Sequence, residues 1–440
     1  MSNLFRDDMY KDFKSPLDKI ESLEKLGEDT AQQLDDISIN VKKLGAKGDG
    51  TTDDTQAVLN AAALLPNGGT LYFPKGTFIV NNVEIPSKVL IRGAGRDSTQ
   101  IKRNADNPVF KVTGTALAGG GAPSHWYNGF EDLTIGSVGS FPSDLTVFQG
   151  VTSMSFQRMK FYATNCRLVF ANQMWDSRFE NVQFFEGGKA DGTPALELAG
   201  GLNGYKQTKE TVLHDCHFEG YKGAAIRTQR DNATQFKTDI ITFTNLKFES
   251  KNCTGSHLNL EANNLFFDGV YVSTEFTTTD VIKMVSCRGV IGKIRVGYAG
   301  TTVVPASLLN TDANCFLFDL VLTVSEPQPV NSNVWTYAAD IPGVRLNAQY
   351  PVINSRTFAF SQIPIGSNTV WFDSTGRMRT NSSRPTSDTS GYRIAREEIG
   401  NTSQRPTSNL YQGRPYFDTT LGKPIWYDGS VWRDATGATV

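Results

Sequence analysis

The middle of the chain repeats a six-residue pattern whose first, fourth and sixth positions are apolar and whose other positions are mostly polar. The copies begin at Phe130, Phe156, Phe179, Leu213, Phe243, Phe267, Ile291 and, in a degenerate form, Phe318. Successive copies start 23 to 34 residues apart. A period of about 20 to 50 residues is typical of solenoids, in which each turn cannot bury its apolar face alone. The pattern therefore predicts a β-solenoid with short strands and regular corners.

The positions of this repeat predict both a core and a corner. Parallel strands stack about 4.8 Å apart, so the apolar positions of successive copies are expected to stack into one continuous core. The third positions are Asp132, Arg158, Asn181, Asp215, Asn245, Gly269 and Lys293. Asn, Asp and Gly tolerate a left-handed backbone, so we expect a ladder of structural corners. Asp215 keeps a functional alternative, because His214 and His217 flank it.

A different pattern precedes the repeats. An extended run over 37–44 meets the turn GAKGDG at Gly45–Gly50, and short oxygen-bearing side chains at 51–54 then come before an alanine-rich segment. Such side chains accept hydrogen bonds from free N–H groups at a helix start, and a Pro-Asn-Gly-Gly sequence ends a helix. The sequence therefore predicts a helix over 55–65 and a strand over 70–73.

This stretch, with GAKGDG, DD, spaced alanines, GG and FPKGT in succession, resembles the opening of the pectate-lyase-like right-handed parallel β-helix family, in the branch common among phage tailspikes and appendages. The resemblance implies an all-β, right-handed parallel β-helix whose N-terminal end is covered by a helix lid at about 53–65. Asp49, Asp53 and Asp54 are then expected to be turn and cap residues. Fold alone does not determine the reaction.

Three regions are expected along the chain. Residues 13–41 carry a loose heptad. Residues 1–36 are therefore expected to form a helical segment that either docks on another protein or forms a short trimeric stem and virion attachment segment. Residues 37–350 would form the β-helix with its lid and loop insertions. Residues 351–440 combine a linker rich in Ser, Thr and Pro with a small β region, whose ending YFDTTLGKPIWYDGSVWRDATG resembles phage tail and fibre proteins. Its candidates for exposed aromatic contacts, to a partner or to a sugar, are Trp426, Tyr427 and Trp432.

Composition limits the classes of partner. The 440-residue chain has a formal net charge of −2, so no general attraction to nucleic acid or to an anionic membrane is expected. No apolar run is long enough to cross a bilayer, and the first residues lack the apolar core of a secretory signal. The five cysteines never occur in C-x-x-C spacing, which favours reduced, buried thiols. A virion component that is made in the host cytoplasm and acts at the bacterial surface would have these properties.

Glycan hydrolysis needs two carboxyl groups with different pKa values. Three glutamates come just after the last apolar position of their repeat copies, namely Glu186, Glu219 and Glu249, and Glu186 comes one residue later than the others. Carboxylates on adjacent turns would lie about 5 Å apart, the separation found in retaining glycosidases. Their repulsion should raise the pKa of at least one of them. The alternative is a structural salt-bridge ladder, because a lysine follows each glutamate within three residues.

Binding residues are often found on long excursions from a rigid scaffold, and such excursions are expected at 104–127, 187–211 and 221–239. The candidate substrate contacts are Trp126, Tyr127, His217, Arg227, Arg230 and Asp231. The two arginines would suit an anionic polymer, or they would belong to a solvated loop. No metal site is expected at His214, Asp215 and His217. Side-chain alternation would place the two histidines on opposite faces of a strand or at unequal positions along it.

The resemblance and these candidates together predict a phage tailspike or appendage protein that binds and hydrolyses a bacterial surface or secreted polysaccharide. It would be a homotrimer attached to virion tail proteins through its N-terminus. Two alternatives remain: a non-catalytic receptor-binding protein of the same fold, and a polysaccharide lyase. The lyase is less favoured, because the chain lacks the clustered aspartates of a pectate-lyase calcium site. No nucleotide or phosphate-binding fingerprint occurs, so neither a cofactor nor a metal is expected.

Overall fold

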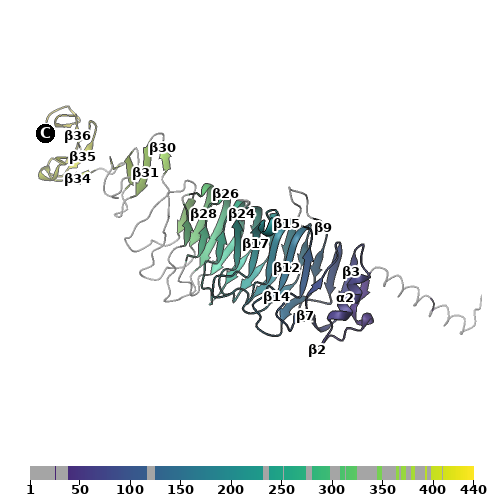
Figure 1. Ribbon diagram of the computed structural model, residues 1–440. Coiled ribbons are helices and arrows are strands. Elements are labelled where there is room, and N and C mark those ends of the chain that lie inside the picture. Colours follow the sequence, from purple (N-terminus) through teal and green to yellow (C-terminus); the bar gives the residue numbers. More distant parts are fainter. Residues whose placement is uncertain are drawn as a thin grey trace, which may run out of the picture. The chain divides into compact units, whose positions relative to one another are not determined.

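A computed structural model describes residues 38–115, 124–230, 237–250, 252–273, 280–297, 308–312, 314–324, 344–348, 363–365, 368–372, 378–381, 392–393, 398–408 and 410–440, together with Lys25. The contacts divide the chain into two units, Met1–Asn354 and Ser355–Val440. The first contains a parallel β-solenoid of about nine turns, so the predicted β-helix is confirmed (Figure 1). The helical segment predicted over 1–36 lies outside the described residues, apart from Lys25.

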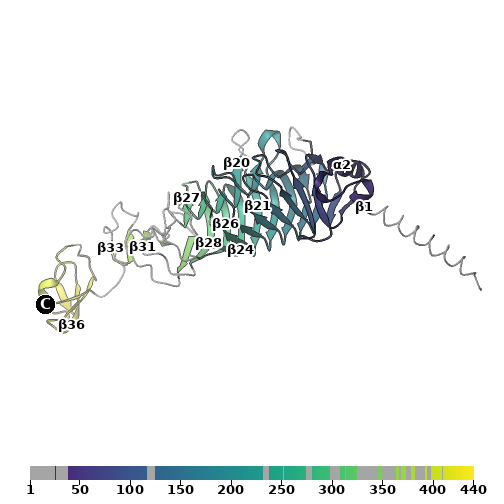
Figure 2. The same cartoon turned by 90° about the horizontal axis from the view of Figure 1, so that it is seen from below.

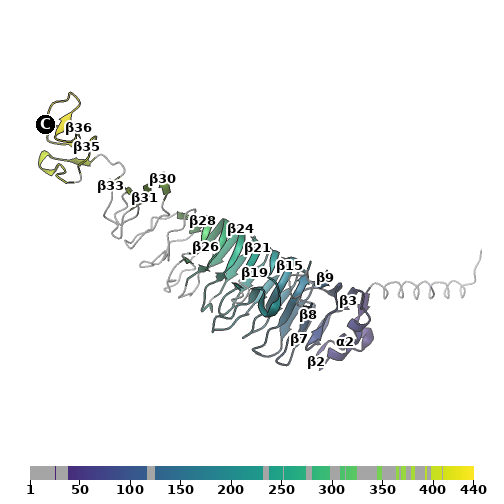
Figure 3. The same ribbon diagram turned by 45° about the horizontal axis from the view of Figure 1, so that its top comes forward.

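The strands of the solenoid form three faces, and each strand pairs in parallel with its counterpart one turn away. The first face contains β1 (Ser38–Asn40), β3 (Gly69–Phe73), β6 (Val89–Gly93), β10 (Gly129–Glu131), β13 (Ser155–Gln157), β15 (Val169–Glu180), β18 (Lys209–His214), β21 (Thr238–Thr244), β24 (Ala262–Ser273), β26 (Arg288–Gly297) and β28 (Phe316–Val324). Figure 3 shows β15, β21, β24 and β28 following one another along this stack.

The second face contains β2 (Asp49–Asp53), β4 (Gly76–Ile79), β7 (Thr99–Arg103), β11 (Thr134–Ser137), β14 (Lys160–Tyr162), β16 (Gln183–Phe185), β19 (His217–Glu219), β22 (Lys247–Glu249) and β29 (Val344–Ala348). The ends of β24, β26 and β28 continue it between β22 and β29. The third face contains β5 (Val83–Glu84), β8 (Phe110–Thr113), β12 (Thr146–Thr152), the start of β15, β17 (Leu196–Gly200), β20 (Ile226–Arg230), β23 (Leu258–Leu260), β25 (Ile282–Met284) and β27 (Leu309–Thr311). The short strand β9 (His125–Trp126) pairs with the end of β12.

A helix, α2 (Thr55–Ala63), lies at the N-terminal end of the solenoid (Figures 1 and 2). Its side chains Val58 and Ala61 are fully buried and join the solenoid core, so the predicted lid is confirmed and is two residues shorter than expected. The extended run predicted over 37–44 is a strand only in β1, because the 3₁₀ helix η1 (Val41–Leu44) follows it. No helix in the described part of the chain has the length and apolarity needed to cross a membrane.

The aspartates of the opening motif are turn and cap residues, as expected. Asp54 accepts hydrogen bonds from the backbone N–H groups of Lys47 (2.6 Å) and Gly48 (3.1 Å), which closes the GAKGDG turn. Asp53 accepts one from the N–H of Thr55 at the start of α2 (2.9 Å). The carboxylate of Asp49 accepts hydrogen bonds from the backbone N–H groups of Thr51 and Thr52, and these bonds lower the pKa of Asp49 well below its usual range. All three carboxylates therefore satisfy local backbone groups.

Inward side chains of successive turns stack on one another, as the repeat predicts. The rings of Phe156 and Phe179 lie 4.3 Å apart between centroids and are nearly parallel, and Phe184 and Phe218 form an equal stack on the second face. All four are fully buried. Offset stacking of this kind adds to the burial of the rings themselves, so the core is continuous from turn to turn.

The predicted corner ladder is confirmed in six of the seven copies. Positive φ angles occur at Asp132, Arg158, Asn181, Asp215, Asn245 and Gly269. The seventh copy was wrongly aligned at its start. The register between β24 and β26 shifts after Phe267, so Val290 is buried, Ile291 is 45% exposed, and Gly292 takes the positive φ in place of Lys293. A one-residue shift reverses the face on which a strand side chain lies.

The second unit contains two small sheets. The first is antiparallel and comprises β30 (Ile363–Ile365), β31 (Asn368–Phe372), β32 (Met378–Asn381) and β33 (Tyr392–Arg393). The second comprises β34 (Glu398–Gly400), β35 (Pro415–Asp418), β36 (Lys423–Tyr427) and β37 (Trp432–Asp434). Trp432 is buried against Tyr416 and Tyr427, so its predicted exposure was wrong, whereas Trp426 is exposed. The 3₁₀ helix η3 (Thr402–Gln404) also lies in this unit, whereas η2 (Leu202–Gly204) lies in the first.

Candidate functional site

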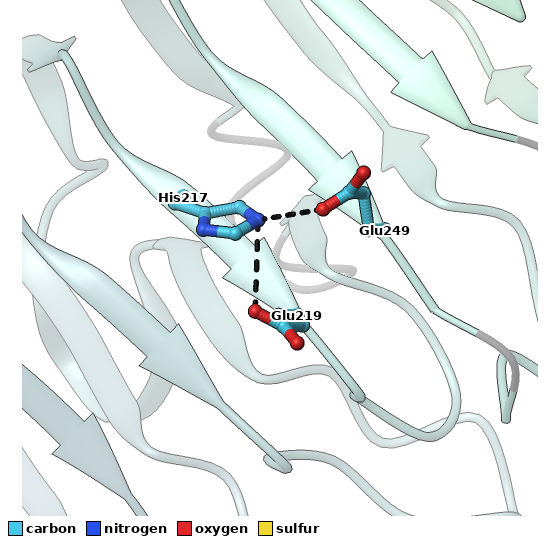
Figure 4. A group of neighbouring side chains, drawn as sticks. All are labelled: His217, Glu219 and Glu249. Atoms are coloured by element: carbon cyan, nitrogen blue, oxygen red, sulfur yellow. Dashed lines mark hydrogen bonds and ion pairs between the residues drawn. The ribbon is translucent and has the colours of Figure 1, made fainter.

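A cluster of polar side chains lies on the second face, where β19 and β22 pair in parallel. His217 is the register partner of Lys247, and Glu219 is the partner of Glu249. Phe218, between His217 and Glu219, is fully buried. Because strand side chains alternate, its two neighbours both point outward. Figure 4 shows His217 between the two carboxylates.

Two of the three distances in this cluster are those of hydrogen bonds. His217 Nε2 lies 3.1 Å from Glu249 Oε2 and 3.9 Å from Glu219 Oε2. Lys247 Nζ lies 2.9 Å from the other oxygen of Glu249. One atom from each of His217, Glu219 and Glu249 lies within 4.8 Å of the others. The solenoid therefore brings two carboxylates to about the separation that retaining glycosidases use.

The two carboxylates have different surroundings. Partial burial alone would raise the pKa of Glu249, but hydrogen bonds from Lys247 and His217 outweigh it and lower the pKa of Glu249 below its usual value. The hydrogen bond between Lys247 and Glu249 also raises the pKa of Lys247. Lys247 contacts Glu249 directly, whereas it acts on Glu219 only through its charge. The expected rise from repulsion therefore does not occur at Glu249, because the two neighbouring groups stabilise its charge.

Aromatic side chains continue this row on the preceding turns. Phe185 is the register partner of Glu219, and Tyr162 is the partner of Phe185. Lys160 Nζ lies 4.1 Å from the Phe185 ring centroid and 5.5 Å from that of Tyr162. Sequence reasoning missed these residues, although Tyr162, Phe185, Glu219 and Glu249 all directly follow the sixth position of the repeat. Together they form an outward row of aromatic and acidic side chains, a combination suited to sugar recognition.

Glu186, the third predicted catalytic residue, lies at a corner and not in this row. Phe185 occupies the register position opposite Glu219, and the N–H of Glu186 donates to the carbonyl of Glu219 (3.0 Å). Its φ of +54° places it in the left-handed region, beyond the end of β16. The one-residue offset visible in the sequence therefore removes Glu186 from the strand, because only strand positions keep a common outward direction.

The predicted arginines lie on strand β20 of the third face and not on a loop, which corrects the expected excursion. Arg227 donates to Glu197 (2.8 Å), which Arg167 also contacts. Glu197 is only 1% exposed, so two guanidinium groups neutralise a buried carboxylate. Arg230 pairs with Glu261 at 3.0 Å. Asp231 lies outside the described residues.

Trp126 and Tyr127 lie at the corner between the third and first faces. Trp126, on β9, is the register partner of Thr152 on β12. The two aromatic side chains are 40% and 64% exposed, and Tyr127 has a positive φ of 57°. The described pairings therefore assign them to a different part of the solenoid from His217.

A second carboxyl pair, which sequence reasoning missed, lies at the same kind of corner. Asp176 and Glu210 have φ angles of 47° and 53°, and the pairings Trp175 with Lys209 and Ser177 with Thr211 flank them on adjacent turns. A hydrogen bond between the two carboxyl groups is the main cause that raises the pKa of Glu210. Both residues precede the start of a repeat copy by three positions, as Tyr127 does, and this constant offset was the available signal.

His217, Glu219 and Glu249 offer nitrogen and oxygen donors of the type that bind divalent cations. Lys247 already donates to the carboxylate of Glu249, so a metal ion would compete with an ammonium group for that ligand. The contacts of the cluster therefore match an ion-pair network more closely than a dedicated metal site.

The chain matches, over residues 38–274, the family model described as rhamnogalacturonase A/epimerase, pectate lyase-like. This match covers more than half of the chain, so the protein belongs to that pectate-lyase-like family. The resemblance that the opening motif suggested is therefore confirmed.

Individual relatives match shorter parts of the chain. The chain is 43% identical over 109 residues to alginate lyase 7 of Azotobacter vinelandii, which covers 22% of this chain and 12% of that protein. It is 36% identical over 116 residues to the preneck appendage protein of Bacillus phage PZA, with coverages of 26% and 12%. Each match thus spans about an eighth of the relative's length. Among solved structures, ORF18 of Geobacillus virus E2 has a TM-score of 0.58 at 16% identity and covers 97% of this chain and 89% of its own, which supports the fold.

Proposed function

We propose that this protein is a phage tail or appendage protein that binds a bacterial surface polysaccharide on the second face of its solenoid and hydrolyses its glycosidic bonds. The observation that carries the proposal is the pair Glu219 and Glu249, whose oxygens lie within 4.8 Å and whose surroundings differ. A similarity to a phage appendage protein supports the virion role, and a similarity to an alginate lyase supports a polysaccharide substrate.

The different surroundings assign the two carboxyl groups different roles. Lys247 and His217 keep Glu249 ionised, so Glu249 is the carboxylate that attacks the anomeric carbon and forms a covalent glycosyl intermediate. Glu219, on the adjacent strand, donates a proton to the departing glycosidic oxygen and then accepts one from the water that releases the sugar. Phe185 and Tyr162 extend the site along the axis and offer ring faces to neighbouring sugars.

In this proposal, each of the three regions of the chain has its own role. Residues 1–36 attach the protein to the virion, 37–350 present the glycan site, and 351–440 form a linker and a small terminal β region. The protein assembles as a homotrimer in the host cytoplasm and acts at the bacterial surface. Hydrolysis by two carboxyl groups needs neither a metal nor a cofactor.

One observation favours a second candidate, a receptor-binding protein without catalysis. The contacts among Lys247, Glu249 and His217 are those of an ordinary ion-pair ladder, which needs no substrate to explain it. In that case the aromatic and acidic row binds the glycan and leaves its bonds intact. A lyase would differ again, because β-elimination leaves an unsaturated sugar.

These candidates separate on the products formed from a panel of purified bacterial surface polysaccharides that includes alginate. The assay measures binding, polymer length, new reducing ends and the ultraviolet absorbance of unsaturated sugars. Hydrolysis predicts shorter polymer and new reducing ends without added absorbance, and Glu219→Gln removes this activity. Glu180→Gln is the matched control, because Glu180 lies on the first face with an exposed side chain. Tight binding without cleavage would overturn the hydrolase, and added absorbance would identify a lyase.

A further inference from the structure

Two of the five cysteines face each other across adjacent turns near the C-terminal end of the solenoid. Arg288 and Phe316 are register partners at the starts of β26 and β28, and Cys287 and Cys315 directly precede them. The N–H of Phe316 donates to the carbonyl of Cys287 (3.1 Å), and the N–H of Cys287 donates to Sγ of Cys315 (3.3 Å). The two cysteines therefore lie immediately before a pair of register partners, with Sγ of Cys315 against the backbone of Cys287.

We propose that Cys287 and Cys315 form an intramolecular disulfide when the folded protein meets a low-molecular-weight disulfide oxidant. The register partners that directly follow the two cysteines lie on strands about 4.8 Å apart, and disulfide-bonded residues have Cα atoms about 4.4 to 6.8 Å apart, so the bond needs no large backbone movement. The contact of Sγ of Cys315 with the backbone of Cys287 shows that this sulfur already lies toward its neighbour.

The other three cysteines have no such partner. All five cysteines lie in the described part of the chain, and each is a free thiol there. Among the contacts of these described cysteines, a hydrogen bond joins Cys287 to Cys315 and no other pair. Cys216 holds the fourth position of its repeat copy, where the adjacent copies have Val182 and Leu246. Cys253 donates to the carbonyls of Gly223 and Gly255 instead. The solenoid spacing thus selects one pair.

The surroundings of the pair define an order of reaction. Cys287 is fully buried, whereas Cys315 retains 6% exposure. Burial raises the pKa of Cys287, and the hydrogen bond from Cys287 lowers the pKa of Cys315. Cys315 is therefore the first nucleophile, because the thiolate is the reactive form.

The oxidation balances with oxidised glutathione as the oxidant. The Cys315 thiolate attacks one sulfur of glutathione disulfide, forming a mixed disulfide and releasing one glutathione thiolate, which takes up the proton that Cys315 lost. Cys287 then loses its proton and attacks Sγ of Cys315, which forms the protein disulfide and releases the second glutathione. Two electrons pass from the protein thiols to the oxidant. The bond would join two neighbouring turns near the end of the solenoid, independently of any activity toward glycans.

The test uses the full-length protein, fully reduced and freed of reductant, and then incubated with oxidised glutathione under native conditions. Free thiols are counted after denaturation in the presence of an alkylating reagent, and a non-reduced digest is analysed by mass spectrometry. The expected result is a fall from the five thiols of the sequence to three. The digest should contain one linked peptide pair joining positions 287 and 315, lighter by two hydrogen atoms than the two reduced peptides.

Matched variants separate this pair from the other thiols. Cys315→Ser should remove the linked peptide, whereas Cys216→Ser should keep it, because Cys216 is a buried cysteine outside the pair. Cross-linking should also raise the melting temperature of the wild type by about 5 °C, and reduction should reverse the rise. Five unchanged thiols, a stable glutathione adduct on Cys315, or a link to any other cysteine would overturn the proposal. The wild-type digest decides the question even if a variant fails to fold.

Discussion

Two pairs of carboxyl groups lie on adjacent turns of the same solenoid, and their electrostatics are opposite. On the second face, Glu249 lies beside Glu219 but is bound by Lys247 and His217, and its pKa is lowered. At the corner between the third and first faces, Glu210 hydrogen-bonds to Asp176, and its pKa is raised although Lys209 lies 3.4 Å away. The backbone imposes a similar spacing on both pairs.

The difference shows that the solenoid backbone determines where the carboxyl groups lie, whereas the side chains that contact them determine which carboxyl groups stay ionised. A cation in direct contact with one carboxylate makes the second-face pair unequal, with one member held ionised. At the corner, the two carboxyl groups share a hydrogen bond, which favours the protonated form of one of them. A glycosidase needs unequal carboxyl groups beside a sugar-binding surface, and on the second face the aromatic side chain of Phe185 is the direct register partner of Glu219.

The largest expected effect separates the two pairs by activity. Glu249→Gln should reduce polysaccharide cleavage by about 10²- to 10⁴-fold, because it removes a charged group that acts directly on the substrate. Asp176→Asn and Glu210→Gln should leave the cleavage rate within about twofold of wild type, since a surface substitution away from the site changes little. The rate of reducing-end formation is the measurement. Equal losses in the corner variants would move the active site to that corner.

A third carboxylate extends the contrast to full burial. Glu197 lies between Arg167 and Arg227. Arg167 also pairs with Asp144 (2.7 Å), so Glu197→Ala leaves Arg227 as the partly buried guanidinium group without its carboxylate partner. We expect a loss of about 1 to 3 kcal/mol in the free energy of unfolding, measured by denaturant titration. Glu180→Ala, at an exposed site, should change the same quantity by less than about 0.5 kcal/mol. Similar small effects in both variants would show that the arginine ladder is not structural.

The next prediction removes the cation that makes the second-face pair unequal. Lys247→Met deletes the hydrogen bond that lowers the pKa of Glu249, so this pKa should rise. Cleavage needs the ionised carboxylate, so the fall in activity on the acid side of the pH profile should occur at a higher pH than in wild type. The pH dependence of kcat/KM measures this fall. Lys209→Met is the control at the corner pair, and a fall that moves equally in both variants would contradict the assignment.

The smallest expected effect is on stability at neutral pH, where the two pairs should respond with opposite signs. The raised pKa of Glu210 means that its contribution is favourable at acid pH and is lost as the pH rises through the folded-state pKa. Glu210→Gln should therefore raise the melting temperature at pH 7. The lowered pKa of Glu249 means that its contribution is present at neutral pH and is lost on acidification, so Glu249→Gln should lower it.

Both stability changes should be within about 0.5 kcal/mol, because the groups are partly exposed and screened by solvent. Melting curves at pH 7 and pH 4 provide the measurement. The two differences from wild type should shrink at the lower pH. Changes of the same sign at pH 7 would show that the two pairs do not differ in the way that their contacts indicate.

The repeat predicted much of the fold because its signal is dense. Apolar side chains recur at three fixed positions, and residues such as Asn181 and Asn245 mark left-handed corners by their type. The first position of the last full copy failed, because a register shift after Phe267 exchanges the faces and composition does not reveal such a shift. Strand β20 was predicted as a loop, because a short strand with four polar residues out of five has a weak apolar pattern.

The candidate site was predicted only in part. Equivalent repeat positions placed Glu219 and Glu249 together, since strand geometry is regular. His217 was predicted as a substrate contact but was not placed beside the two glutamates. The sequence did not show whether Glu186 lies in the same row, because one residue decides whether a side chain belongs to a strand or to the corner after it. Alternation along β22 also places Lys247 and Glu249 on one side, but the direction of the pKa change depends on which side chains form hydrogen bonds, and spacing alone does not give that.

The most direct test of the account is a structure of the Glu219→Gln variant with a bound oligosaccharide from a cleaved polymer. The account predicts a sugar ring over β19 and β22, with its anomeric carbon facing the carboxylate of Glu249 and a neighbouring sugar against Phe185. An oligosaccharide bound at the corner beside Trp126 and Tyr127, or on the small terminal sheet, would contradict it.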